Sequence, residues 1–329
     1  MMRVALVGLG SVGRGVARMI AEKDLGITLT GIADSKSGCM DPEGLDIENL
    51  LLMKNKKGYC GDQTISATDV IKKAEYDALI EVTPTNALTG QPAIGYIKTA
   101  LLRKKHVVTS NKGPIALAYK ELLMLAEKNG VALRYEATVA GAIPIMHTLE
   151  HGLAGNEILA LYGVLNGTCN YILSRMAAEG LTYEQALMEA REMGYAEADP
   201  TYDVQGIDAA IKLVILANTI WGNGTQLSDI DRTGIDLLTP DALRLAENQG
   251  CTIRLIAEAI PRKHILRVSP RIIEKNHPLV TEGTLNALTL ETDMAKEITL
   301  IGRGAGSIET ASAIIGDLLF IKDRYVRCT

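Results

Sequence analysis

The sequence has no long apolar segment and no excess of basic residues. Its 329 residues contain no apolar run that reaches the length of about eighteen expected of a membrane span. The apolar stretch at the N-terminus is too short for a signal peptide, and no small-residue cleavage site follows it. With 34 basic and 39 acidic residues the net charge is −5, which gives no indication of nucleic-acid binding. We therefore expect a cytoplasmic protein with neither a membrane nor a nucleic acid as partner.

The five cysteines are an odd number and lack the spacing of a metal site. We expect Cys39, Cys60, Cys169 and Cys251 to be reduced thiols. Cys328 is next to last in the chain, and in a two-fold dimer two such ends could meet and oxidise to an intersubunit disulfide. A non-reducing gel of the oxidised protein tests this hypothesis.

The first part of the chain alternates short apolar strands with helices. Strands are predicted at residues 3–7, 27–33, 78–82, 106–109 and 131–135, and helices after residue 10 and at 93–103 and 116–128. This rhythm predicts an α/β fold with a Rossmann-type, doubly wound parallel sheet. We place this dinucleotide-binding domain at residues 1–139. A glycine turn at 302–306 precedes a last helix, which we expect to return to this domain within 303–329, with Gly304 and Ala305 near the cofactor.

A glycine motif follows the first predicted strand. Gly8, Gly10 and Gly13 fit the pattern G-x-G-x-x-G between a strand and a helix, which is the context that this fingerprint requires. The glycines allow a tight turn and a close approach of the backbone to a pyrophosphate on the helix N-terminus. The alternative is a glycine-rich turn without a ligand. The context favours a cofactor site that also includes Ser11 and Val12.

Two residues beyond the second predicted strand give opposite indications about the cofactor. Asp34 is placed to bind a ribose 2′-hydroxyl, which favours NAD. Lys36 could instead bind the 2′-phosphate of NADP, so the preference stays open and use of both cofactors is compatible with the sequence. Ligands of open α/β sheets bind at the carboxyl ends of the strands, which makes Thr83, Pro84 and Lys112 further candidates. For Lys112 an ordinary surface lysine is the alternative.

A helix predicted over residues 207–220 carries the strongest indication of a catalytic site. Apart from Asp208 and Lys212 it has no charged residue, and residues four apart lie on one face. A helix that is apolar on nearly all sides belongs in a core, so we expect this pair to be half buried. A structural ion pair is the alternative. Because Glu197 and Asp203 lie just upstream, three carboxylates and one ammonium are predicted to converge there.

The strand–helix alternation ends beyond residue 148, and the rest predicts an α+β catalytic and dimerisation domain, placed at 140–302. Thr182 and Gln185 form a capping box before a helix at 183–192. Thr168 is predicted to cap another helix, whose free N–H groups suit a substrate carboxylate. Glu136, beside a turn of small residues, could hold a hard cation together with backbone carbonyls. An interdomain hinge is the alternative for that segment.

These motifs, taken in order, resemble the homoserine dehydrogenase family. They are Gly8-x-Gly10-x-x-Gly13, Thr83-Pro84-Thr85-Asn86, Asn111-Lys112, Glu136-Ala137-Thr138-Val139, Asn166-Gly167-Thr168, Gly194-Tyr195-Ala196-Glu197-Ala198-Asp199-Pro200, Asp203, Gly206, Asp208, Lys212 and Gly302-Arg303-Gly304-Ala305-Gly306. The resemblance covers nearly the whole chain, and residues 194–212 are its most specific part. It implies an enzyme of threonine and methionine biosynthesis that interconverts L-aspartate 4-semialdehyde and L-homoserine with NAD or NADP by direct hydride transfer.

The resemblance also implies roles for individual residues. Lys212 and Asp208 match the catalytic lysine and its partner acid, and Lys112 matches a second lysine of the site. Glu197 matches the acid that engages the substrate ammonium. Further substrate contacts are implied for Thr168, Tyr195 and Asp203.

A monovalent cation such as Na+ and a homodimer are likewise implied by the resemblance. The cation ligands would be the side chain of Glu136 and the main chain of Val139, Gly141 and Ile143. The turn here is Ala-Gly-Ala at 140–142, where the family often has Gly-Ala-Gly, a change that carbonyl ligands tolerate. The chain ends at Thr329, so we expect the short form, without a C-terminal regulatory domain or feedback inhibition through one.

Three other functions stay open at this point. The first is another NAD(P)-dependent amino-acid semialdehyde or hydroxy-acid dehydrogenase. The second is an acylating aldehyde dehydrogenase, which needs a thiolate nucleophile; Cys169 with His147 or His151 is the only candidate. The third is a non-catalytic dinucleotide sensor, which leaves the acids and the lysine of the core helix without a role.

Overall fold

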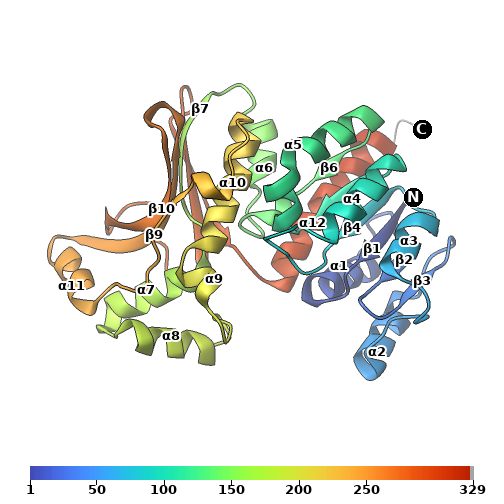
Figure 1. Ribbon diagram of the computed structural model, residues 1–329, viewed down its shortest axis with the longest axis horizontal. Coiled ribbons are helices and arrows are strands. Elements are labelled where there is room, and N and C mark those ends of the chain that lie inside the picture. The colour runs from blue at the N-terminus through green and yellow to red at the C-terminus, as the bar shows by residue number, and fades with distance from the viewer. Residues whose placement is uncertain (327–329) are drawn as a thin grey trace. The chain divides into compact units, whose positions relative to one another are not determined.

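The computed structural model describes residues 1–326, which form two compact units (Figure 1). The first unit consists of Met1–Ala142 together with the C-terminal segment that begins at Gly306, and the second unit is Ile143–Ala305. Cys328, for which an intersubunit disulfide was predicted, lies outside the described residues. Within residues 1–326 no helix is both long enough and apolar enough to cross a membrane.

The first unit is built on a six-stranded sheet with the order β3-β2-β1-β4-β5-β6. Its strands are β1 (Met2–Val7), β2 (Ile27–Ala33), β3 (Gly38–Met40), β4 (Ala78–Glu81), β5 (His106–Thr109) and β6 (Leu133–Arg134). Strands β2, β1, β4, β5 and β6 run parallel, whereas β3 pairs antiparallel with β2 at the edge. The predicted Rossmann-type sheet is therefore confirmed. Strand β3 was not predicted, because three residues that begin with glycine show no recognisable alternation.

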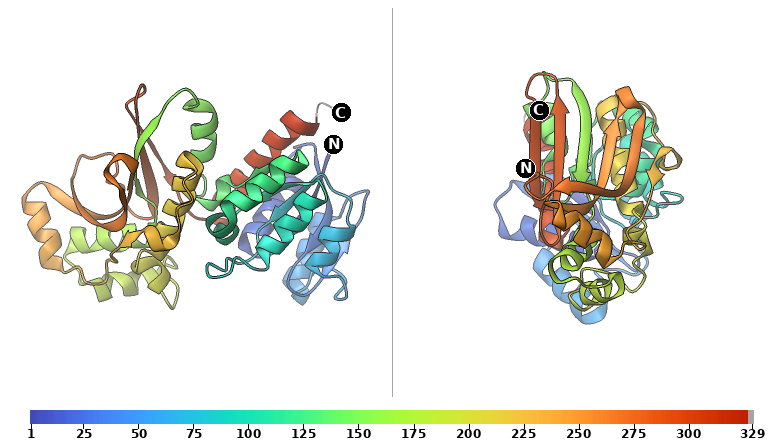
Figure 2. Two further views of the ribbon diagram at one scale, coloured as in Figure 1. Left: turned by 45° about the horizontal axis from the view of Figure 1, so that its top comes forward. Right: turned by 90° about the vertical axis from the view of Figure 1, so that its left-hand side faces the viewer.

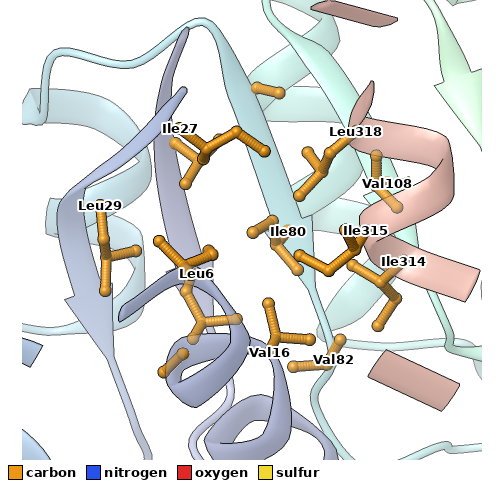
Figure 3. Close-up of a cluster of buried hydrophobic side chains, with 14 of the residues drawn as sticks. Leu6, Val16, Ile27, Leu29, Ile80, Val82, Val108, Ile314, Ile315 and Leu318 are labelled. Carbon is orange, nitrogen blue, oxygen red and sulfur yellow. The ribbon is translucent and has the colours of Figure 1, made fainter. Parts of the chain in front are cut away.

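Helices cover both faces of this sheet. On one face lie α1 (Ser11–Glu22) and α12 (Ser307–Ile321), with α2 (Ile47–Lys57) packed on α1; on the other lie α3 (Ala67–Lys73), α4 (Ala93–Leu102) and α5 (Lys112–Asn129). Because strand side chains alternate between faces, Leu6 and Ile80 meet Val16 and Ile315 in one buried cluster, as Figure 3 shows. Burying each such side chain contributes roughly 1.5–3 kcal/mol. This cluster joins the C-terminal helix to the first strands of the chain.

Helix α5 begins earlier than the sequence predicted, at Lys112 rather than at residue 116. Asn111 is its N-cap, and the side-chain oxygen of Asn111 accepts the backbone N–H of Gly113 at 3.2 Å. Pro114 is tolerated there because N–H groups of a first turn have no partner within the helix. Ala118 has non-helical backbone angles (φ −132°, ψ 26°). The predicted start therefore lies close to an irregular turn inside a longer helix.

The second unit contains another six-stranded sheet, with the order β12-β11-β7-β9-β10-β8. Its strands are β7 (Ile158–Val164), β8 (Asp231–Arg232), β9 (Cys251–Ile260), β10 (Ile265–Glu274), β11 (Leu285–Thr292) and β12 (Glu297–Arg303). All neighbours pair antiparallel except β8 and β10. In the right-hand view of Figure 2, the light green β7 lies beside the orange-red β11, which pairs with β12 along its other edge.

The helices of the second unit are α6 (Ile145–His147), α7 (Gly167–Glu179), α8 (Tyr183–Glu192), α9 (Thr201–Val204), α10 (Ile207–Trp221) and α11 (Pro240–Asn248). The predicted α+β character of this part is confirmed. The predicted N-cap of α7 was wrong, because the cap is Asn166, whose side chain accepts the N–H of Cys169, rather than Thr168. Both residue types are good caps, and they stand two positions apart. The capping box of Thr182 and Gln185 on α8 is confirmed.

Candidate active site

Helix α10 places Asp208 and Lys212 one turn apart on the same face. The Lys212 ammonium nitrogen lies 2.8 Å from Asp208 Oδ2. Lys212 is 7% exposed and Asp208 is 4% exposed, so the pair is buried more deeply than the half burial that we expected. The reason is that α10 packs against α9, β9 and β10. Moving two charges out of water costs free energy. The mutual attraction of the two side chains and their hydrogen bonds offset this cost.

The turn between β7 and α7 supplies two further contacts to this pair. The backbone carbonyl of Leu165 accepts a hydrogen bond from Lys212 Nζ at 2.5 Å. The side-chain amide of Asn166 donates to Asp208 Oδ2 at 3.0 Å and to Asp203 Oδ1 at 2.7 Å. Asn166 was noted in the sequence only as part of a motif, without a role. Its position directly after a strand and before a helix is the signal that could have marked it as a cap.

Burial sets the protonation of the groups around Asn166. Burial raises the pKa of the Asp203 carboxyl; the hydrogen bond from Asn166 opposes this shift, and the negative charge of Asp208 adds to it. Burial also raises the pKa of the Cys169 thiol well above its usual range, and the charges of Asp203 and Asp208 raise it further. The Cys169 S–H donates to the Asp203 carbonyl at 3.2 Å. Cys169 is therefore a neutral thiol, which is the wrong state for a nucleophile.

The loop that leads to α9 carries the remaining predicted substrate contacts. Thr168 Oγ1 donates to the backbone carbonyl of Tyr195 at 2.8 Å, and the Tyr195 ring packs edge-on against Tyr171 with 4.9 Å between centroids. Glu197 is exposed and makes no hydrogen bond or ion pair within residues 1–326. The structure thus joins Asp203, Asp208 and Lys212 through hydrogen bonds, and it leaves Glu197 outside this network.

The glycine turn of the first unit has the steric requirements of a dinucleotide site. A Cβ atom on Gly8 would lie 2.5 Å from the carbonyl oxygen of Val82, and one on Gly13 would lie 2.0 Å from the carbonyl oxygen of Gly8. Gly8 also has a φ of 101°, a region that favours glycine. At Gly10, the N-cap of α1, no atom lies within 4 Å of the Cβ position, so the space beside the start of this helix is open. These residues therefore fit a pyrophosphate that approaches the backbone at Gly10 and Ser11.

Asp34 follows β2, and its carboxylate is already engaged. Oδ1 accepts the N–H groups of Lys36 and Ser37 at 2.7 and 2.8 Å, and Oδ2 accepts the ammonium of Lys54 at 2.6 Å. Burial alone raises the pKa of Asp34, but the hydrogen bond and charge of Lys54 with the backbone hydrogen bonds lower it overall. Lys36 itself is exposed. Lys54, which the sequence did not single out, thus adds a cation beside the predicted ribose-binding acid.

A buried carboxylate ties together the loops that carry the other candidate cofactor contacts. Glu81 is fully buried, and it accepts the N–H of Thr83 at 2.9 Å, the Thr83 hydroxyl, and the hydroxyl of Thr109 at 2.8 Å. The Asn111 amide donates to the carbonyls of Thr83 and Pro84 at 3.2 and 3.5 Å. Since Asn111 caps α5, this network also fixes the start of the helix that presents Lys112.

Glu136, the candidate cation ligand, is 2% exposed and opens a 3₁₀ turn, η1 (Glu136–Thr138). Its backbone N–H donates to the Asp317 carboxylate of α12 at 3.0 Å. Val139 and Gly141 belong to the same unit, whereas Ile143 begins the second unit. Residues 1–326 hold no group of three His, Cys, Asp or Glu side chains that could bind a metal ion. One carboxylate with carbonyl oxygens remains a ligand set that suits a hard cation.

Gly304 and Ala305, two predicted cofactor contacts, are the last residues of the second unit. The segment before them was predicted as a glycine turn, but residues 300–303 belong to β12. A Cβ atom on Gly304 would lie 1.8 Å from the side-chain oxygen of Asn286. A larger residue at position 304 would therefore require the Asn286 side chain to move.

The parallel sheet with its glycine turn and the buried lysine of the second unit define a dehydrogenase that uses a nicotinamide dinucleotide. Two family models match the chain: "Homoserine dehydrogenase, NAD binding domain" over residues 8–136, and "Homoserine dehydrogenase" over residues 144–319. The chain belongs to the homoserine dehydrogenase family.

Relatives and solved structures agree with this assignment. The homoserine dehydrogenase of Methanocaldococcus jannaschii is 45% identical, over 97% of this chain and 98% of that protein. The NAD(+)-dependent homoserine dehydrogenase of Pseudomonas canavaninivorans is 37% identical, over 99% and 97%. The crystal structure of an Archaeoglobus fulgidus protein matches with a TM-score of 0.92 at 47% identity, over 98% of this chain and 99% of that one. For the homoserine dehydrogenase of Thermoplasma acidophilum the TM-score is 0.84 at 29% identity, over 98% and 99%.

Proposed function

We propose that this protein interconverts L-homoserine and L-aspartate 4-semialdehyde with NAD or NADP. The observation that carries this proposal is the buried Lys212–Asp208 pair, which is held by the Leu165 carbonyl and the Asn166 amide. Membership of the homoserine dehydrogenase family supports it. The raised pKa of Cys169 speaks against an acylating dehydrogenase, because a neutral buried thiol does not attack a carbonyl.

The reaction needs a proton and a hydride to move together. When bound, the nicotinamide accepts the hydride from the alcohol carbon of homoserine, or donates it to the aldehyde. As the neutral amine, Lys212 takes the hydroxyl proton during oxidation and becomes the ammonium; as the ammonium, it gives that proton to the oxygen during reduction. Asp208 fixes the Lys212 side chain through the 2.8 Å contact, and Lys112 assists as a second cation. A positioned acid–base group of this kind contributes about 10²–10⁴ in rate.

The rest of the second unit would bind the amino-acid part of the substrate. Glu197 is an exposed carboxylate, suited to pair with the substrate ammonium. Thr168 and Tyr195, which are joined by a hydrogen bond from the Thr168 hydroxyl to the Tyr195 carbonyl, and the carboxyl of Asp203 would provide further hydrogen-bonding groups for the substrate. The alcohol oxygen would then face the Lys212 nitrogen.

For the cofactor we propose that both NAD and NADP are used. The glycine turn at 8–13, with the steric pattern described above, supports a bound pyrophosphate. At the ribose, Asp34 and Lys54 form an ion pair at 2.6 Å. The pair offers an acceptor for a 2′-hydroxyl and a cation for a 2′-phosphate, with Lys36 nearby in the chain.

We also propose a monovalent cation and a homodimer. Glu136, Val139, Gly141 and Ile143 would hold the cation, which is tested by comparing activity in Na+ with activity in a bulky organic cation of equal ionic strength. The dimer is supported by apolar side chains on the second sheet: Ile272 on β10 is 63% exposed and Ile301 on β12 is 53% exposed. Light scattering of the purified protein measures the assembly.

One spectrophotometric experiment tests the proposed reaction. Absorbance in the reduced-nicotinamide band is followed with L-homoserine and either NAD+ or NADP+, and L-serine, which lacks one methylene, is the control substrate. We expect the band to rise with homoserine and not with serine. Absence of any rise with homoserine under both cofactors, by a protein shown to be folded, would overturn the proposal.

A further inference from the structure

The side chain of Asn166 makes two kinds of contact through its two ends. Its oxygen accepts the backbone N–H of Cys169 at 2.8 Å and so caps α7. Its nitrogen donates to Asp203 Oδ1 at 2.7 Å and to Asp208 Oδ2 at 3.0 Å. Asn166 is 5% exposed, so both ends act away from bulk water.

Capping alone does not explain why an asparagine stands at this position. An N-cap needs only an oxygen acceptor, and serine or aspartate serves about as well as asparagine. What asparagine adds is an NH2 group with two hydrogens. Here these two hydrogens are directed at two different carboxylates, which come from α9 and from α10.

The amide nitrogen of Asn166 therefore helps to set the orientation of the Lys212 side chain. Asp208 Oδ2 is the same oxygen that contacts Lys212 Nζ. The neighbouring residue, Leu165, offers its carbonyl to that same nitrogen. One short turn thus contacts Lys212 directly through its main chain and indirectly through an amide and a carboxylate.

The two carboxylates also repel one another, and the amide compensates for this. Within the second unit, Asp203 faces Asp208, Lys212, Thr168 and Cys169 as well as Asn166. The hydrogen bond from Asn166 favours the ionised form of Asp203, whereas Asp208 disfavours it. Without the amide donor, the Asp203 and Asp208 carboxylates would lie close together in a buried site, and no hydrogen bond from Asn166 would fix their relative positions.

From this geometry we propose that Asn166 is a positioning residue for the proton transfer: its amide holds Asp203 and Asp208 together, and through Asp208 it fixes Lys212. The role rests on the proposed function, since it concerns the lysine assigned there as the acid–base group. The side-chain hydrogen bonds of Asn166 join it to Asp203, Asp208 and the backbone of Cys169, so it acts on Lys212 through Asp208.

The test separates the two ends of the side chain. Asn166→Ser keeps a capping oxygen and removes the amide donor. Asn166→Asp is isosteric, keeps the cap, and sets a third carboxylate against the other two. Thr239→Ala is the matched control: it removes the cap of α11, which accepts the N–H of Ala242, in the same unit and away from Lys212.

We expect N166S to lower kcat for homoserine oxidation by roughly 10- to 100-fold, because small misplacements of a catalytic group cost about this much. N166D should lose more, and the KM for the cofactor should stay within a few-fold in both. The acid limb of kcat/KM should move to higher pH in N166S, because the Asp203 carboxyl loses its donor. T239A should keep the wild-type kcat and pH profile.

A second readout does not depend on activity. The only tryptophan of the chain, Trp221, ends α10, so its fluorescence reports unfolding of the second unit in urea. In N166S the urea midpoint should fall further at pH 8 than at pH 5, because a lower pH favours the protonated form of Asp203 and so weakens its repulsion of Asp208. A lost cap, as in T239A, should lower the midpoint equally at both pH values.

Two results would overturn the proposal. One is a wild-type kcat and pH profile in N166S and N166D when Lys212→Ala is inactive. The other is an equal loss of stability at pH 5 and pH 8 in N166S, which would reduce Asn166 to a helix cap. If the wild-type protein were inactive and the urea midpoint of N166S still fell further at pH 8 than at pH 5, the proposed function would be wrong. The role of the Asn166 amide in holding Asp203 and Asp208 together would still be supported.

Discussion

Replacing Asp208 and Lys212 by apolar residues, singly and together, tests how strongly the buried pair is coupled. Asp208→Leu and Lys212→Met remove the charges and keep much of the side-chain volume. In each single variant, one buried charge loses the partner that stands 2.8 Å away. In the double variant both charges are absent, so neither is left uncompensated.

The magnitude follows from the distance and the burial. At 2.8 Å, an effective dielectric constant of about 20 gives an attraction of about 6 kcal/mol, which is an upper limit for the coupling. Breaking a buried pair on one side typically costs about 3–5 kcal/mol. The double variant should cost less, about 1–3 kcal/mol, because it loses hydrogen bonds, among them those to Leu165 and Asn166, without leaving a buried charge behind. The resulting coupling energy should therefore be about 3–6 kcal/mol.

The assay is urea denaturation followed by the fluorescence of Trp221, the single tryptophan of the chain. The Trp221 indole donates to the carbonyl of Ile158 at 3.0 Å, so its environment changes when the second unit unfolds. The matched control is the Glu247–Lys275 ion pair of the same unit, at 2.6 Å but about half exposed. A cycle on this pair should give a coupling below about 1 kcal/mol.

The reasoning is refuted if the two cycles give similar coupling energies. That result would mean that the Lys212 and Asp208 charges are as well solvated as a surface pair. The same conclusion would follow if Lys212→Met alone left the urea midpoint unchanged.

Three further predictions concern other parts of the molecule. Gly10→Ala should leave the thermal midpoint unchanged and weaken cofactor binding in a fluorescence titration. Gly13→Ala should lower the thermal midpoint of the first unit, because its methyl group would lie 2.0 Å from the carbonyl oxygen of Gly8. Equal thermal midpoints for the two variants would contradict this prediction. Cys169→Ser should keep kcat within a few-fold, since the raised pKa keeps the thiol neutral; a loss of a thousandfold would restore a nucleophilic cysteine. Because burial raises the pKa of Asp203 above its ordinary value of 3.8, the native state binds that proton more tightly than the unfolded chain. The contribution of Asp203 to stability should therefore fall as pH rises from 3.8 through the native pKa, and Asp203→Asn should remove this slope from urea midpoints.

Much of the fold was predictable because it is encoded locally. The capping box at Thr182 and Gln185 sets the start of α8. Along each strand, successive side chains alternate between the two faces of the sheet, so the sequence predicts which residues share a face. Strand β3 was missed because three residues carry too little pattern. Helix α5 was predicted to begin at residue 116, but it begins at Lys112 and includes Pro114 in its first turn, which accommodates proline.

The site was predictable only where its residues are neighbours in sequence. Asp208 and Lys212 stand four apart on one helix, so periodicity alone pairs them. The contact of Asn166 with Asp203 spans 37 residues, and that of Leu165 with Lys212 spans 47. Such contacts depend on how β7 and α10 pack, which no local pattern specifies. The cap of α7 was assigned to Thr168, whereas the structure gives it to Asn166, two residues earlier.

The most direct test of the account is the kcat of Lys212→Ala with homoserine, measured beside cofactor binding in the same preparation. The Trp221 emission spectrum of the variant establishes that its second unit is folded. We predict that kcat falls by about 10²–10⁴ while the dissociation constant for the cofactor stays within a few-fold of wild type. Activity within a few-fold of wild type would contradict the assignment of Lys212 as the group that transfers the proton.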